Sequence, residues 1–134
     1  MNLRTIVMLG CLVGLVAAAH ATLVIKPEPV QVTGQTAIVK LELKNTFTNA
    51  VESARAAVFV SDENGKVVGQ ATRWIVGGTA DRPALEPDKE TAFHFVVPLS
   101  GEFSTNLQVR ILPSRLIFKG GRMGNPAKDF QIVQ

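Results

Sequence analysis

The chain has 134 residues, of which 46% are hydrophobic and 19% are charged, and its formal net charge is +3. This composition excludes a disordered or low-complexity protein and is typical of a single folded domain. One Cys and two His residues give no basis for a disulfide framework, a cysteine-based metal cluster or a histidine-rich metal site.

Residues 1–21 have the features of a secretory signal peptide. Arg4 supplies the positive charge, and the apolar run over residues 6–19 leads to small residues at a cleavage point. This run is shorter than the roughly 20 apolar residues that a membrane-spanning helix needs. The sequence before Cys11 resembles the end of a lipoprotein box, so a lipid-anchored Cys11 is an alternative.

Two Ala-x-Ala cleavage points overlap at the end of this leader. Cleavage after Ala21 releases Thr22, and cleavage after Ala19 releases His20; we favour the first. The sequence therefore predicts a periplasmic or secreted protein, with a folded domain over residues 22–134 and no transmembrane span in the mature chain.

After the leader, apolar and polar residues alternate as they do in β-strands. Residues 23–26 and 30–32 are predicted to form an edge segment that Pro27 and Pro29 interrupt, since proline is tolerated at a sheet edge. Residues 36–45 form the clearest strand, with one apolar and one polar face.

A second strand is predicted at residues 53–61, with Ala54, Ala56, Val58 and Val60 facing inward. The sequence Asp62-Glu63-Asn64-Gly65 then predicts a hairpin turn, because Asn and Gly tolerate positive φ. Residues 66–76 return as the partner strand. A loop over residues 77–88 separates this hairpin from a strand at residues 89–97.

The C-terminal part of the chain is predicted to contain three more strands. Residues 107–111 form a strand that Pro113 ends, and residues 115–119 form a short one. A glycine-bearing loop over residues 120–127 leads to the closing strand at residues 129–133.

No window of the sequence has helical periodicity. Seven to nine short strands with regular turn signals indicate an all-β fold, an immunoglobulin-like antiparallel β-sandwich. In such a fold the apolar side of each strand faces the other sheet. The core is therefore predicted to contain Leu41, Leu43, Val58, Phe93, Phe95 and Leu107.

Residues 37–97 resemble the small bacterial immunoglobulin-like modules of the FxLYD type. The matching pieces are VKLELKN at residues 39–45, VFVSD at residues 58–62 and LEPDKETAF at residues 85–93. The chain departs from the signature itself, where Val58, Val60 and Ser61 replace Phe, Leu and Tyr. The resemblance implies an exported, non-catalytic module and carries over no functional residues.

The two His residues define an alternative function. If the leader is cleaved after Ala19, His20 becomes the N-terminal residue, and His94 would add a third nitrogen ligand. Nitrogen ligands of this kind suit Cu(II) in square geometry, so a periplasmic copper- or metal-binding protein is the alternative. Cleavage after Ala21 removes His20, and we therefore predict no metal and no cofactor.

Catalytic arrangements are not apparent in the sequence. The predicted mature domain has no Cys, and no Gly-x-Ser-x-Gly elbow is present. The acidic residues around Asp62 and Glu86 lie in a turn and a loop, where solvated carboxylates are the default. We predict that the protein is not an enzyme.

Aromatic residues give little indication of a ligand site. Trp74 is the single Trp, and it is predicted to be a core or half-buried sandwich residue, with an exposed contact for a sugar or peptide as the alternative. Aromatic residues are not interleaved with the basic stretch, and an exported protein rarely meets nucleic acid. We predict no nucleic-acid partner.

Charge is distributed unevenly along the chain. The basic residues of the last thirty positions are Arg110, Arg115, Lys119, Arg122 and Lys128, and the single acid there is Asp129. A basic end favours anionic surfaces of the cell envelope, although a solvated loop has the same composition.

Within this basic end, residues 118–125 carry three glycines and join two predicted strands. Lys119 and Arg122 lie close to Met123, whose flexible side chain adapts to irregular surfaces. Binding residues tend to lie on loops that a rigid scaffold carries. The sequence therefore predicts an exported, non-catalytic binding or structural accessory module of the bacterial cell envelope. Its predicted contacts to a protein or an anionic envelope component are Lys119, Arg122 and Met123.

Overall fold

The structure is a computed structural model that describes residues 20–104 and 106–134. Of the predicted signal peptide, residues 1–19 lie outside the described part of the chain, as do the lipid-anchor alternative at Cys11 and the alternative cleavage point after Ala19. Across the described part of the chain, no helix has the length and apolar character needed to cross a bilayer.

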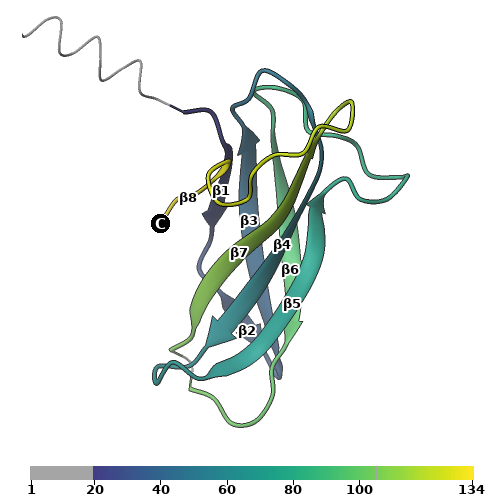
Figure 1. Ribbon diagram of the computed structural model, residues 1–134. Helices are drawn as coiled ribbons and strands as arrows, with labels where there is room; N and C mark the ends of the chain where they lie inside the picture. The colour runs from purple at the N-terminus through teal and green to yellow at the C-terminus, as the bar shows by residue number, and fades with distance from the viewer. Residues whose placement is uncertain (1–19, 105) are drawn as a thin grey trace, which may run out of the picture.

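The described chain forms eight strands in two sheets (Figure 1). The strands are β1 (Leu23–Pro27), β2 (Gln31–Thr33), β3 (Thr36–Asn45), β4 (Val51–Ser61), β5 (Val67–Val76), β6 (Glu90–Pro98), β7 (Gln108–Phe118) and β8 (Phe130–Ile132). One sheet has the order β5–β4–β7 and lies in front in the view of Figure 1. The predicted all-β sandwich is confirmed, and the strand number falls within the predicted range.

Strand β3 is the centre of the other sheet. It pairs with β1 and β2 along one side and with β6 along the other, always antiparallel. Strand β8 lies outside β1 and pairs with it in parallel, from Leu23 opposite Phe130 to Ile25 opposite Ile132. This pair is an exception to the antiparallel arrangement that the sequence predicts. Strands β7 and β8 lie in different sheets, so no hairpin turn requires β8 to run antiparallel to its neighbour.

The prediction of an edge segment at residues 23–32 is wrong for its first half. Strand β1 lies between β3 and β8, whereas β2 pairs with β3 alone. The pairing partner of β1 comes from the other end of the chain, so local sequence carries no sign of it. The prolines do interrupt the segment, as predicted, since Pro27 is the last residue of β1 and Pro29 lies between β1 and β2.

The prediction that Pro113 ends a strand is also wrong. Strand β7 runs without interruption past Pro113, and Ala56 of β4 lies opposite it. Two features make this possible. Strand β7 is at the edge of its sheet, and the register with β4 shifts between Arg55 and Ala56, so that Ser114 is an extra residue of a β-bulge. Proline in a sheet is found at such edges and bulges, because it cannot donate to the ladder.

The predicted hairpin turn at residues 62–65 is confirmed. Gly65 has a φ of 84°. The Asp62 carboxylate accepts hydrogen bonds from the backbone N–H groups of Asn64 and Lys66, at 2.9 and 3.0 Å. A short acidic side chain at the start of a turn stabilises it in this way.

The core lies between the two sheets and contains most of the residues that the alternation predicts. Leu41, Val58 and Phe95 are fully buried, and Leu43 is 1% exposed. Leu107 and Phe93 are only partly buried and pack against the rim of the core, which corrects their predicted place within it. Leu107 precedes β7, and the ring of Phe93 is covered by Arg82 at 4.9 Å, so neither is enclosed by both sheets.

Candidate functional site

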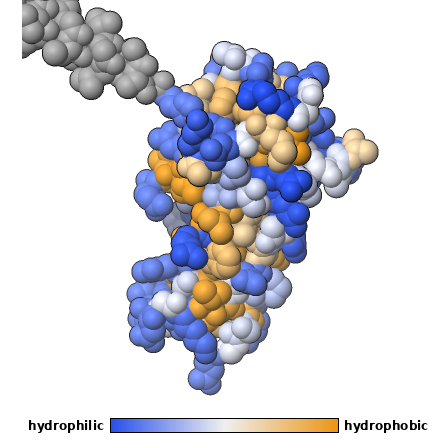
Figure 2. All heavy atoms as spheres, viewed as in Figure 1, coloured by the Kyte–Doolittle hydropathy of each residue, from blue (hydrophilic) through white to orange (hydrophobic). Residues whose placement is uncertain are grey.

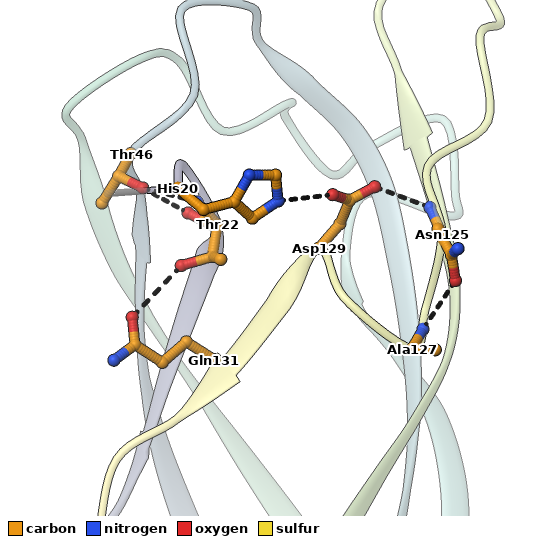
Figure 3. Close-up of polar contacts among 7 residues, drawn as sticks. All are labelled: His20, Thr22, Thr46, Asn125, Ala127, Asp129 and Gln131. Atoms are coloured by element: carbon orange, nitrogen blue, oxygen red, sulfur yellow. Dashed lines mark hydrogen bonds and ion pairs between the residues drawn. The ribbon is translucent and has the colours of Figure 1, made fainter. Parts of the chain in front are cut away.

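The two His residues of the metal hypothesis lie on different parts of the sheet. His20 is exposed ahead of β1, and its Nε2 atom lies 3.2 Å from Oδ1 of Asp129 (Figure 3). His94 is exposed on β6, where it lies opposite Lys40 of β3.

The strand register separates these two imidazoles. Leu23 lies opposite Asn45, and His94 lies opposite Lys40, which is five positions further along β3. Five residues of a strand span about 16 Å, and His20 lies beyond the Leu23 end. The structure therefore does not bring His20 and His94 together. Over residues 20–104 and 106–134 there is no group of three or more His, Cys, Asp or Glu side chains that could hold a metal ion.

We expect Cu(II) to bind the mature protein that begins at Thr22 no more tightly than an ordinary exposed imidazole. The reason is that a chain beginning at Thr22 has one His and no Cys, and that among the described residues no group of three or more His, Cys, Asp or Glu side chains could hold the ion. Calorimetric titration of wild type and His94→Ala with Cu(II) checks this. Stoichiometric binding with a nanomolar Kd that is lost in His94→Ala would contradict it and restore the metal hypothesis.

The predicted contact residues lie at a tightly turned tip after β7. The backbone N–H of Gly121 donates to the carbonyl of Phe118 at 2.9 Å, and the N–H of Phe118 donates to the carbonyl of Arg122 at 2.8 Å. Gly120 and Gly121 have φ values of 100° and 92°, which favour glycine because it has no Cβ. The hydrogen bonds and the two glycines give the tip a defined shape.

The structure brings Lys119, Arg122 and Met123 together on this tip. All three are exposed, and the side chain of Met123 is 60% exposed. The Cζ atom of Arg122 lies 4.3 Å from the ring centroid of Phe118, a cation–π contact that orients the guanidinium. The N–H of Lys119 donates to the carbonyl of Ala50 at 3.0 Å and fastens the tip to the start of β4.

The segment between the tip and β8 is held by local polar contacts (Figure 3). The Asp129 carboxylate accepts a hydrogen bond from the Asn125 N–H at 2.7 Å, and Asn125 Oδ1 accepts one from the Ala127 N–H at 2.9 Å. The Thr22 carbonyl accepts a hydrogen bond from the Thr46 hydroxyl at 2.6 Å. The first two contacts hold the segment that leads from the tip to β8, and the third joins the residue before β1 to the residue after β3.

Trp74 is half-buried on β5, as predicted. Arg55 lies over its ring, with Cζ 5.7 Å from the centroid, and Arg82 Nη1 donates to the Trp74 carbonyl. A Cβ on Gly78 would lie 2.4 Å from Cγ of Trp74, so the glycine allows the indole to pack closely.

A hollow of about 380 Å³ lies under the loop between β5 and β6. Its charged lining residues have both signs: Arg82, Glu86, Lys89 and Glu90. In the same loop, the hydroxyl of Thr79 donates to the Asp81 carboxylate and holds the pKa of that carboxyl below its usual range. Because the lining charges compensate one another, this hollow has no preference for one sign of ligand charge.

Sequence analysis assigned Arg110 and Arg115 to the basic C-terminal part of the chain, but it missed that they form a group with Arg55 on the outer face of the β5–β4–β7 sheet. Arg55 of β4 lies opposite Arg115 of β7, and Phe59 of β4 lies opposite Arg110. The Cζ atom of Arg110 lies 5.3 Å from the ring centroid of Phe59. The sequence does show part of this group, because alternation within β4 places Arg55 and Phe59 on the outward side of the strand. Their neighbours on β7 are far away in the sequence.

The same side of the molecule is shown in Figure 2. Apolar residues form an interrupted band along its long axis, with strongly hydrophilic residues on both sides. Leu112, which is 53% exposed, belongs to this sheet and lies opposite Ala57. The face therefore combines cations with exposed apolar surface.

No protein-family model and no curated protein matches the chain. Solved structures with a similar course of the chain include a Bordetella pertussis protein described as ApaA, at 14% identity over 78% of this chain and 83% of that one, with a TM-score of 0.48. IrmA from Escherichia coli is 13% identical over 84% and 92%, also at 0.48.

The archaellum periplasmic stator protein FlaG from Sulfolobus acidocaldarius is 13% identical over 78% of this chain and 95% of that one, with a TM-score of 0.37. Similarities this low carry no argument about the function of this chain. The resemblance to FxLYD-type modules stays a prediction.

Proposed function

We propose that the protein is an exported, non-catalytic binding or structural accessory module that contacts an anionic component or a protein of the bacterial cell envelope. The observation that carries this proposal is the tip after β7, where Lys119, Arg122 and Met123 are exposed together on a hydrogen-bonded turn. A preformed surface loses little conformational entropy on binding, so its contacts translate into affinity.

The charges at the tip favour an anionic partner. Phe118 holds the Arg122 guanidinium, and the ring of Phe118 itself packs against Phe47 with 4.8 Å between centroids. A guanidinium that lies on an aromatic ring keeps its N–H groups available for a carboxylate or phosphate. Export to the periplasm or beyond, which the leader at residues 1–21 predicts, would place this tip among anionic envelope components.

Charge reversal at the tip, in Lys119→Glu/Arg122→Glu, is expected to abolish or strongly reduce capture of the partner from native envelope extract. Both side chains are exposed, so the free energy of unfolding should change by no more than about 0.5 kcal/mol for each substitution. The measurement is a pull-down with the tagged mature domain. Raising the salt concentration should weaken a true contact of this kind.

A matched double variant on the opposite sheet, Lys26→Glu/Lys44→Glu, serves as the control, since both lysines are exposed on β1 and β3. It should retain the wild-type set of captured proteins. If the tip variant also retains that set, the tip is not the contact surface.

A further inference from the structure

We infer that the outer face of the β5–β4–β7 sheet binds a linear acidic polysaccharide through carboxylate groups, with Arg110 at one end and Arg55 and Arg115 at the other. This inference goes beyond the proposed function, since it assigns a second binding surface and the chemical class of its ligand. It concerns a surface distinct from the tip.

The two sheets differ in the kind and balance of their charges. The basic residues of β4, β5 and β7 are Arg55, Arg73, Arg110 and Arg115, and Glu52 is the one acidic residue in these strands. The strands of the other sheet carry Lys26, Lys40 and Lys44 together with Glu42 and Glu90. Arginine differs from lysine in that its planar guanidinium binds a carboxylate with two parallel hydrogen bonds.

The arginines of this face are available for a ligand. Neither of the two ion pairs found among residues 20–104 and 106–134 includes Arg55, Arg110 or Arg115. Two of these guanidinium groups lie over aromatic rings, Arg55 over Trp74 and Arg110 over Phe59. Stacking restricts the side chain and leaves its N–H edge exposed, so less freedom is lost when an anion binds.

The spacing of the cations fits a chain of charges better than a single anion. Arg55 and Phe59 are four residues apart on β4, which corresponds to about 13 Å along the strand. Arg115 and Arg110 lie opposite these two positions. The face therefore presents two cationic positions in line, separated by Ala57 and the exposed Leu112.

A hollow of about 340 Å³ lies at the Arg110 end of this face. Its lining includes Phe59, Ser61, Val67, Gln108 and Arg110. It therefore joins a guanidinium, a hydroxyl and an amide to apolar side-chain surface. A uronic acid residue offers the matching groups: a carboxylate for Arg110, ring hydroxyls for Ser61 and Gln108, and a C–H face for the apolar lining.

These features favour a polysaccharide over other anionic partners. A bilayer surface is broad and flat and would use the cations without entering a hollow that is lined by a hydroxyl and an amide. An acidic peptide supplies carboxylates but no array of hydroxyl groups. The polar lining of the hollow is therefore the observation that selects a sugar acid.

The test uses the purified mature domain and oligomers of polygalacturonate. Trp74 is the single Trp and lies beside Arg55, so its fluorescence reports binding at that end of the face. We expect Arg110→Gln and Arg55→Gln each to weaken binding about tenfold or more, because a hydrogen bond to a charged group contributes about 1.5–3 kcal/mol. Calorimetry with the same variants measures Kd independently of fluorescence, and melting temperatures should stay close to wild type.

Lys44→Gln, which removes one exposed cation from the opposite sheet, is the matched control and should bind like wild type. Four results would overturn the inference: no binding of polygalacturonate at low salt, equal binding of neutral dextran, equal loss of binding in Lys44→Gln, or tighter binding of phosphatidylglycerol vesicles or poly-glutamate. If the envelope pull-down still depends on Lys119 and Arg122 in that case, the proposed function stands and only the role of the arginine face is rejected.

Discussion

Truncation of Phe95 to Ala is expected to lower the free energy of unfolding by about 3–5 kcal/mol, the range for deletion of a buried aromatic side chain. Phe95 is fully buried, and its ring lies 5.1 Å from that of Phe93 in an edge-on arrangement. It is opposite Val39 in a nine-pair ladder between β3 and β6. That ladder prevents the backbone from collapsing into the space left by the ring, so most of the cavity should remain. Urea denaturation measures the loss.

Val96→Ala is the matched control for Phe95→Ala. Val96 follows Phe95 on the same strand, points to the opposite face and is 57% exposed. Its truncation should change the free energy of unfolding by no more than about 0.5 kcal/mol. A loss below about 1 kcal/mol for Phe95→Ala would contradict the burial of this ring between the sheets.

The second large effect is expected for Asn45→Ala, which should lower the free energy of unfolding by about 2–4 kcal/mol. Asn45 is fully buried at the end of β3. Its Nδ2 donates to the carbonyls of Asn49 and Leu85, both at 2.9 Å, and its Oδ1 accepts from the Phe47 N–H at 2.8 Å. Each such bond contributes about 0.5–1.5 kcal/mol, and a buried partner left without one costs about 1–3 kcal/mol.

Asn45 also connects segments that are distant in the sequence. Because its amide reaches Leu85, its loss should loosen the loop before β6 as well as the turn after β3. Amide hydrogen exchange should show faster exchange at Phe47 in Asn45→Ala. Asn106→Ala, at an exposed position, is the control and should leave both stability and exchange unchanged. Equal stability of the two variants would mean that the amide of Asn45 is not needed to hold these segments.

Local sequence determined a large part of this fold. Alternation of apolar and polar residues placed β3 at its observed bounds and assigned Ala54, Ala56, Val58 and Val60 of β4 to the core, where all are fully buried. The Asp62–Gly65 turn was predictable for the same reason, since its chemistry lies within four residues. Side-chain direction in a strand repeats every two residues, so a short window is enough to find the inward face.

Two features of the fold that local sequence patterns did not predict depend on contacts with neighbouring strands. Pro113 stays within β7 because the strand is at an edge and Ser114 forms a bulge against Arg55. Strand β1 is covered by β8 because residues 107 positions apart pair in parallel, as Leu23 does with Phe130. Neither pairing leaves a mark in a local window, since hydrogen bonds between strands involve the backbone and are nearly independent of residue type.

The two candidate binding surfaces also differ in how much of each could be predicted from the sequence. The tip residues Lys119, Arg122 and Met123 lie within five consecutive positions of the sequence, and the two glycines between Lys119 and Arg122 predicted a turn that would expose them together. The arginine face required the register of β4 with β7, which puts Arg55 beside Arg115 and Phe59 beside Arg110. Alternation tells which residues point outward from each strand, but only the pairing of strands decides which outward residues become neighbours, because register is a long-range property of the fold.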